Sequence, residues 1–348
     1  MASRTRHASA VSHGARHHSI TQYFTNMKFL NLSAAVLAAA LVTVTAAHSQ
    51  ESIKPPGTEA AGQAHQKSTI SVETVSPEIR KIRFSNPPLN FIVPETLSSL
   101  NEVIKSLSKD DKVKVVIFTS DVSGYFFNHF DTSEFPNFLS QVAGNSKPLW
   151  VDLVSNLANA PFITIASIHG RTQGGGDELA LALDLRYASK ERAVFGQPEV
   201  GLGIFPGGGG TDHLARLVGR DRALEILLSS DDYTAETAEK YGWITRAVPE
   251  QYLDGFVAKM AKRLATFDKT ALLTTKKQIN ASAFPDEAAL LNSYGQFVKS
   301  VSWPGLQPRM QLFGRMIQEV GPAKVESNMG RYIGEGNQQL QAEQASKK

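Results

Sequence analysis

Three consecutive glycines, Gly174 to Gly176, stand between the pattern of a buried strand and the pattern of a helix. The apolar run "PFITIASIHG" precedes them, and the acids Asp177 and Glu178 open the helical segment that follows. The first amides of a helix have no partner inside it and lie at the positive end of its dipole. Because glycine carries no side chain, a ligand atom can touch this backbone. The order strand, glycine turn, helix therefore predicts a backbone site for a developing negative oxygen.

The two acids after the glycines also have a simpler interpretation. An acid in the first helical turn stabilises the helix dipole by about 0.3–1 kcal/mol, and Asp177 and Glu178 both satisfy this rule. Nothing further in the sequence supports a catalytic role for Asp177. Dinucleotide or triphosphate binding is not favoured, because "GRTQGGGDE" has neither the G-x-G-x-x-G spacing nor the GK[ST] ending of such sites.

A second acid, Glu199, lies in the proline- and glycine-rich stretch "FGQPEVGLGIFPGGGGT". An acid in a stiff, apolar loop is poorly solvated, so its pKa should rise towards neutrality. Two acids in different, desolvated surroundings form a plausible general acid and general base. Glu178 and Glu199 together are therefore the candidate catalytic pair.

Strand and helix patterns alternate along residues 68–253, and helical patterns dominate residues 254–348. Apolar, β-branched runs such as "KVKVVIFTSD" are typical of strands buried on both faces. In "PETLSSLNEVIKSLSKD", Leu97, Leu100, Ile104 and Leu107 fall on one helical face. This order predicts an α/β domain followed by a helical C-terminal region.

The first fifty residues have the composition of a targeting segment. "FLNLSAAVLAAALVTVTAA" is uncharged and follows Lys28, with small residues near Ala47, as in a secretory signal whose natural start would be Met27. A membrane anchor and an organellar transit peptide remain alternatives, the latter because the segment carries arginines and serines but no acid. Residues 51–67 are polar and are predicted to form a disordered linker.

Composition excludes several classes of function. The net charge of +3 is small, and no basic patch with interleaved aromatics is seen, so a nucleic-acid partner is not expected. The chain has no cysteine, which rules out disulfides, thiolate nucleophiles and Cys-ligated zinc.

Three segments resemble the crotonase, or enoyl-CoA hydratase/isomerase, superfamily. "HGRTQGGGDELALALDLRYAS" is similar to its glycine turn and acidic helix start, "FGQPEVGLGIFPGGGGTDHLARLVG" to its second-acid loop, and "TAETAEKYGWITRAVP" to a later helix and strand. The resemblance implies a spiral of ββα turns, a homotrimer or hexamer, and acyl-CoA thioester substrates. It implies no metal and no cofactor beyond the coenzyme A of the substrate.

By this resemblance, Glu178 and Glu199 match the two glutamates of true hydratases. Gly175 matches one amide of the oxyanion hole, and Phe130 supplies the other, because Asn128-His129-Phe130-Asp131 stands where the family usually has Ala-Gly-Ala-Asp. The wider substrate pocket is expected to include the residues beside these positions, namely His129, Asp131, Gly174, Gly176, Pro206 and Gly207.

Three further positions bear on coenzyme A binding and on proton transfer. Ser133 stands where relatives often carry a lysine near the coenzyme A phosphates, and "SVSWPGLQPRM" lacks the Glu-Gly signature of the family's C-terminal helix. His129 is either a packed side chain or a third proton-transfer group, and His169 is expected to be packed.

The sequence therefore predicts a lyase that adds water to an enoyl thioester through an enolate. Two alternatives remain: an isomerase that moves a double bond with the same groups, and an exported protein of this fold without coenzyme A activity. The signal-like segment and the altered loop favour the last alternative. They leave the compartment open among export or the periplasm, membrane anchoring, an organelle and the cytoplasm.

Overall fold

The computed structural model describes residues 68–346. The expected targeting segment and linker, residues 1–67, lie outside the described residues. Between Ser68 and Ser346, no helix combines the length and the apolar character needed to cross a membrane.

The larger of two sheets has six strands, and only its first pair is antiparallel. β1 and β2 form a hairpin, and each later strand is added in parallel. In spatial order the strands are β1 (Thr69–Ser76), β2 (Ile79–Ser85), β3 (Val115–Ser120), β4 (Ile163–Ile168), β6 (Leu185–Ser189) and β9 (Arg246–Val248).

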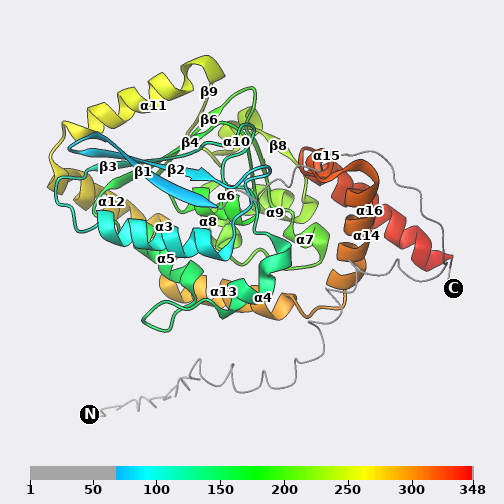
Figure 1. Cartoon of the computed structure of the whole chain (residues 1–348). Helices are drawn as coiled ribbons and strands as arrows, with labels where there is room; N and C mark the ends of the chain where they lie inside the picture. The colour runs from blue at the N-terminus through cyan, green and yellow to red at the C-terminus, as the bar shows by residue number, and fades with distance from the viewer. Residues whose placement is uncertain (1–67, 347–348) are drawn as a thin grey trace, which may run out of the picture. The chain divides into compact units, whose positions relative to one another are not determined.

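Both faces of β3 are buried, as its apolar run predicts. Successive side chains of a strand point to opposite faces. Val116 and Phe118 therefore enter the main core, whereas Val115 and Ile117 face a second, smaller core beneath helix α11 (Glu250–Ala265). Figure 1 shows α11 on one side of the sheet and helices α3 and α5 on the other.

The smaller sheet has three short strands, β5 (Arg171–Gln173), β7 (Val194–Gly196) and β8 (Tyr233–Thr234). β5 and β7 run parallel, with Gln173 opposite Gly196, and β8 pairs antiparallel with β7. Parallel neighbours end at the same edge of a sheet, so the segments that follow β5 and β7 emerge side by side.

Along the chain, the helices of the α/β region follow β2 and precede β9. They are α3 (Pro94–Leu107), α4 (Phe135–Ser140), α5 (Leu149–Ala158), α6 (Gly175–Leu181), α7 (Glu199–Leu202), α8 (Gly210–Leu217), α9 (Arg220–Ser229) and α10 (Ala235–Tyr241), with a 3₁₀ turn η2 at Thr132–Glu134.

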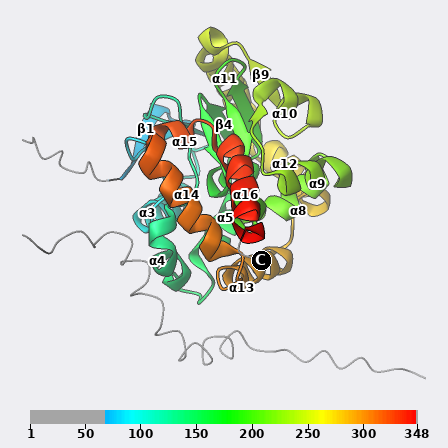
Figure 2. The ribbon, with the colours of Figure 1, turned by 90° about the vertical axis from the view of Figure 1, so that its right-hand side faces the viewer.

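Helices make up the rest of the described chain. After α11 come α12 (Lys269–Ala283), α13 (Glu287–Ser300), α14 (Leu306–Val320), α15 (Pro322–Glu326) and α16 (Met329–Ala345). Figure 2 shows α14 and α16 side by side, with α15 between them in the chain. The α/β class and the helical C-terminal region predicted from the sequence are confirmed.

Candidate active site

The ends of β5 and β7 bring the two candidate glutamates together. The Gly174 amide donates to the Gly196 carbonyl at 2.9 Å, which extends the parallel pairing by one residue. α6, which carries Glu178, starts after β5, and α7, which starts with Glu199, follows β7. A Cβ atom placed on Gly174 would lie 2.6 Å from Glu199 Oε1.

Gly174 is suited to this position in two ways. Its φ of 48° lies in the left-handed region that favours glycine. A side chain there would also collide with Glu199, so the turn before α6 and the second glutamate approach each other because residue 174 is bare.

The surroundings of Glu199 differ from the sequence-based expectation in one respect. The sequence predicted a stiff loop, but Glu199 is the first residue of the one-turn helix α7, with Pro198 as its N-cap. The helix ends at Leu202, and its C-cap is Gly203, whose φ is 83°. The local sequence still fixes the position of Glu199, because the proline and the left-handed glycine bracket the turn.

Glu178 is buried, with 3% of its surface exposed, and two backbone amides hold it. Its Oε1 accepts hydrogen bonds from the Gly208 amide at 2.7 Å and from the Gly210 amide at 3.0 Å. Both donors belong to the glycine run that leads into α8, whose first residue is Gly210. Each amide favours the ionised form of the carboxyl group.

The carboxyl group of Glu199 has less complete hydrogen bonding than that of Glu178. Its Oε2 atom is buried and has no hydrogen-bond partner among residues 68–346. An unpaired buried oxygen is costly when charged, so the protonated form of Glu199 is favoured. Within one site, ionisation is therefore favoured for Glu178 and protonation for Glu199.

The pKa values of the pair follow from these contacts. Burial raises the pKa of Glu178 to about 7, against the opposing effect of the Gly210 and Gly208 amides. Burial, and then the charge of Glu178, hold the pKa of Glu199 well above its ordinary value. Because two amides favour charge on Glu178 and Glu199 Oε2 has no donor among the described residues, a single proton shared by the pair is favoured on Glu199.

The Phe130 amide is oriented by the peptide group that contains it. The His129 carbonyl accepts a hydrogen bond from the Ile92 amide at 3.0 Å. In a planar trans peptide, the N–H points opposite to the carbonyl oxygen. The Phe130 N–H therefore points away from Ile92, and no backbone acceptor engages it within the described residues.

The Gly175 amide is oriented in the same manner by α6. The Gly174 carbonyl accepts the first hydrogen bond of the helix, from the Glu178 amide at 2.9 Å. The Gly175 N–H therefore points out of the N-terminal end of α6. The Phe130 ring packs against this glycine, because a Cβ on Gly175 would lie 2.5 Å from Phe130 Cε2.

The side chain of Phe130 fills space that the family pattern, with alanine there, leaves open. Its ring packs against Phe138 at 4.7 Å and Trp150 at 5.1 Å between centroids. The cavity that remains among these rings and Phe297 is only about 20 Å³. That volume holds about one water molecule.

His129 is engaged at both ring nitrogens and does not point into open space. Nδ1 lies 2.7 Å from the Phe130 carbonyl oxygen, and Nε2 lies 3.1 Å from Glu326 Oε2. Asn128 Nδ2 also donates to Glu326 Oε2, at 3.2 Å. Glu326 ends α15 and is buried, so the C-terminal region contacts the loop that carries the Phe130 amide.

The other expected pocket residues lie next to the site but have different contacts. A Cβ on Gly176 would meet the Phe127 carbonyl, and one on Gly207 would meet α13. Pro206 is buried. Asp131 caps η2 by accepting from the amide and the hydroxyl of Ser133.

Three groups of the site were not identified from the sequence. Gly208 and Gly210 belong to a run of four glycines that is visible in the sequence. That their amides bind Glu178 could not be predicted, because this contact depends on the fold. Glu326 gave no signal, because one acid in a polar C-terminal segment is ordinary.

Asp177 has a structural role beside the site. Its carboxyl oxygens accept from Gln197 Nε2 at 2.7 Å and from Trp243 Nε1 at 3.0 Å. Burial raises its pKa to about 8. These contacts join α6 to the segment after β7 and to the turn before β9.

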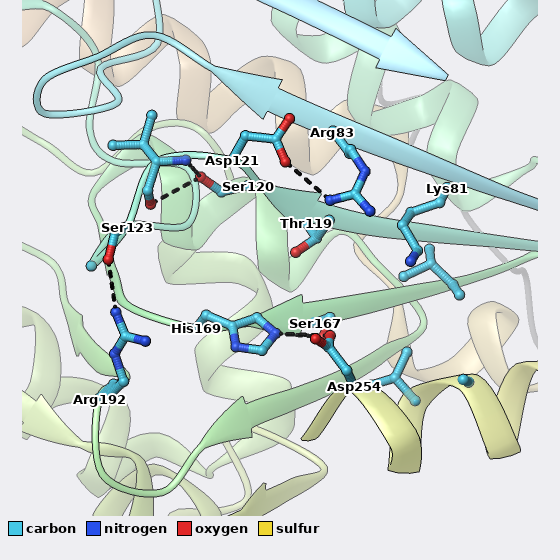
Figure 3. Close-up of a pocket in the computed structure, with 15 residues that line it drawn as sticks. Lys81, Arg83, Thr119, Ser120, Asp121, Ser123, Ser167, His169, Arg192 and Asp254 are labelled. Carbon is cyan, nitrogen blue, oxygen red and sulfur yellow. Dashed lines mark hydrogen bonds and ion pairs between the residues drawn. The ribbon is translucent and has the colours of Figure 1, made fainter. Parts of the chain in front are cut away.

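His169 lies at a different cavity, of about 280 Å³, beyond the ends of β3 and β4 (Figure 3). Its Nδ1 lies 3.1 Å from Glu250 Oε1 and its Nε2 3.1 Å from Asp254 Oδ1, with Ser167 Oγ at 3.3 Å. His169 is thus in a polar hydrogen-bond network rather than in an apolar core. No group of His, Cys, Asp and Glu side chains suited to a metal ion occurs in residues 68–346.

The chain is similar to a known protein family and to a named relative. The family described as "Enoyl-CoA hydratase/isomerase" matches residues 74–327. A protein of Dictyostelium discoideum named "Probable enoyl-CoA hydratase, mitochondrial" is 35% identical over 196 residues, which are 56% of this chain and 69% of the relative.

Solved structures show the same likeness. A "putative enoyl-CoA hydratase" from Streptomyces avermitilis is 37% identical, with a TM-score of 0.72 over 76% of this chain and 96% of that one. An enoyl-CoA hydratase from Bacillus anthracis is 26% identical, with a TM-score of 0.57 over 71% of this chain and 96% of that one.

Proposed function

Because the chain belongs to the enoyl-CoA hydratase/isomerase family, we propose that it adds water to the C2–C3 double bond of an enoyl-CoA thioester. The observation that carries the proposal is the contrast between two adjacent glutamates. Glu178 accepts two backbone hydrogen bonds, whereas Glu199 has an unpaired buried oxygen.

In the proposed reaction, Glu178 is the general base and Glu199 the general acid. Ionised Glu178 takes a proton from water as the water oxygen bonds to C3 and the double-bond electrons move to the thioester as an enolate. Protonated Glu199 then gives its proton to C2. The product is the 3-hydroxyacyl thioester, and a proton returns from Glu178 to Glu199 or through solvent before the next cycle.

The Phe130 and Gly175 amides are proposed to bind the thioester oxygen. Negative charge develops on that oxygen as the enolate forms, and fixed backbone donors stabilise it without reorganisation. The direction of each N–H group is fixed by the carbonyl of the same peptide group, which accepts a hydrogen bond elsewhere. The His129 carbonyl fixes the Phe130 N–H, and the Gly174 carbonyl fixes the Gly175 N–H. Addition of water involves no net oxidation, so the proposal needs coenzyme A only as part of the substrate.

We also propose that the acyl chain is short. The rings of Phe130, Phe138 and Trp150 line a cavity of only about 20 Å³, and Phe130 itself packs against Gly175. A long acyl chain entering this region would have to displace packed aromatic side chains, which is costly in a close-packed interior. Crotonyl-CoA is therefore the first substrate to test.

The experiment compares Glu178→Gln, Glu199→Gln and the double variant on crotonyl-CoA. Each single substitution is expected to lower kcat by about 10²–10⁴-fold, the usual contribution of a positioned acid or base. The double variant should lose far less than the product of the two, because both groups serve one transition state. Glu95→Gln is the control, since Glu95 is also a first-turn helix acid but lies on the exposed surface of α3.

The results of this experiment distinguish a hydratase from an isomerase and from a protein without coenzyme A activity. An isomerase that moves the double bond should depend mainly on one glutamate, and its product would be the shifted enoyl thioester rather than the 3-hydroxyacyl thioester. A protein without coenzyme A activity should neither bind nor convert the substrate. Full hydratase activity in both single variants would refute the assigned roles.

A further inference from the structure

Glu326 connects the C-terminal helical region to the peptide that carries the Phe130 amide. Glu326 Oε1 and Oε2 lie 3.2 and 3.1 Å from His129 Nε2, and Oε2 also accepts from Asn128 Nδ2. His129 in turn lies 2.7 Å from the Phe130 carbonyl through Nδ1. The three consecutive residues 128–130 are thus tied to one buried carboxylate.

Glu326 is itself held firmly against this loop. Only 3% of its surface is exposed, and it forms the last residue of α15. The next residue, Ser327, accepts a hydrogen bond through its carbonyl from the Arg171 guanidinium at 2.9 Å. Arg171 belongs to β5, the strand that leads into the glycine turn, so α15 is anchored to both sides of the candidate oxyanion hole.

The contacts of His129 indicate that the ring is an imidazolium ion. A neutral imidazole can donate from only one nitrogen, but both nitrogens of His129 face oxygen acceptors. Burial alone would lower the pKa of His129, but the charge and hydrogen bond of Glu326, the Phe130 carbonyl and the charge of Asp131 raise it above its ordinary value. Glu199 also lies near His129, because a Cβ on Gly174 would be 2.6 Å from Glu199 Oε1 and 3.3 Å from His129 Cβ.

We propose that Glu326 is a positioning residue, which holds His129 between itself and the Phe130 carbonyl and so fixes the Phe130 amide towards the thioester oxygen. This rests on the hydration reaction proposed above. Because both nitrogens of His129 are occupied within the protein, neither is directed at a substrate, and His129 acts through the backbone rather than by proton transfer. The C-terminal helical region is then a working part of the site.

The kinetic test is Glu326→Gln, which keeps the size of the side chain and removes its charge. A misplacement of about 1 Å at a reacting group can cost 10²-fold in rate. We expect kcat on crotonyl-CoA to fall roughly tenfold to 10²-fold, with KM changed much less, because the thioester oxygen needs the Phe130 amide most in the transition state. Glu335→Gln is the matched control, since Glu335 forms an exposed ion pair with Arg331 on α16.

The second readout does not depend on activity. Nitrogen-15 NMR of the His129 ring at neutral pH should show both nitrogens protonated in the wild-type protein and a lower pKa in Glu326→Gln. The Phe130 amide resonance should shift in the same variant and stay fixed in Glu335→Gln. A merely structural Glu326 would lower the melting temperature without moving these signals.

The two readouts distinguish a failure of the positioning role from a failure of the proposed hydration reaction. If the wild-type protein does not hydrate crotonyl-CoA but the His129 and Phe130 signals respond as expected, the reaction is wrong and the positioning contact stands. A neutral His129 ring in the wild type, or unchanged kcat in a folded Glu326→Gln protein that hydrates crotonyl-CoA normally, would overturn the role of Glu326.

Discussion

Glu178 and Glu199 carry the same carboxyl group, and their neighbours make them different. The amides of Gly208 and Gly210 stabilise charge on Glu178, whereas Glu199 has no donor for its buried Oε2 among the described residues. The desolvation that raises both pKa values is common to the pair. In the proposed mechanism, backbone donors rather than residue type make Glu178 the base.

The pH dependence of kcat/KM should report this difference. Activity is expected to rise as the pH passes through about 7, where Glu178 ionises. It should fall again at more alkaline pH, where Glu199 loses the proton that it must donate. The measurement is initial hydration rate against pH, with melting curves at each pH as the control for folding. Activity that falls as the pH rises through 7 would contradict the assignment of Glu178 as base.

At the scale of elements, α6 and the loop after β3 touch backbone to backbone. A Cβ on Gly176 would lie 2.0 Å from the Phe127 carbonyl oxygen and 2.4 Å from that of Asn128. Neither carbonyl can move aside as a flexible side chain would. The two elements that carry the candidate oxyanion donors therefore approach each other at a bare residue of the glycine turn.

Gly176→Ala should separate these two elements. We expect a loss of stability of about 1–3 kcal/mol, the usual cost of forced overpacking, and a larger loss of hydration activity. Gly255→Ala in α11 is the control, because nothing lies within 4 Å of its Cβ position. That change should raise stability by about 0.5–1 kcal/mol. Thermal melts of the two variants measure both effects, and an equally stable, active Gly176→Ala protein would disprove the close approach.

The same elements show which features of the fold and of the candidate site could be predicted from the sequence. The strands around "KVVIFTS" and "ITIASI" and the helix from Pro94 were predictable, because periodicity and burial pattern are local properties. So was the pairing of Glu178 with Glu199 as candidates, since each stands in a glycine-rich context. The contact of Glu326 with His129 was not predictable, because it depends on where α15 packs, nearly two hundred residues further along the chain.

At the scale of the whole molecule, α12 leaves apolar surface beside a cavity of about 550 Å³. Ile279, which lines it, is 57% exposed, and Phe267 and Leu217 are also exposed. Exposed apolar patches of this kind commonly mark contacts between proteins. The resemblance to a trimeric superfamily makes a second copy of this chain the expected partner.

We therefore predict a homotrimer, or a pair of trimers, that Ile279→Lys weakens. Light scattering at micromolar concentration should give a trimer or hexamer mass for the wild type and a smaller mass for the variant. Tyr252→Lys is the control, because Tyr252 is 62% exposed but does not line this cavity. A wild-type protein that is a stable monomer would refute the prediction.

The hydrogen bond between Glu326 and His129 has a consequence for the order in which the protein is made. The two residues are 197 positions apart, and a ribosome adds about 5–20 residues per second. Roughly ten to forty seconds therefore separate the synthesis of the two partners. Both glutamates and both glycine turns are synthesised within that interval, before the carboxylate that ties down the loop. The site is therefore complete only after α15 has been synthesised.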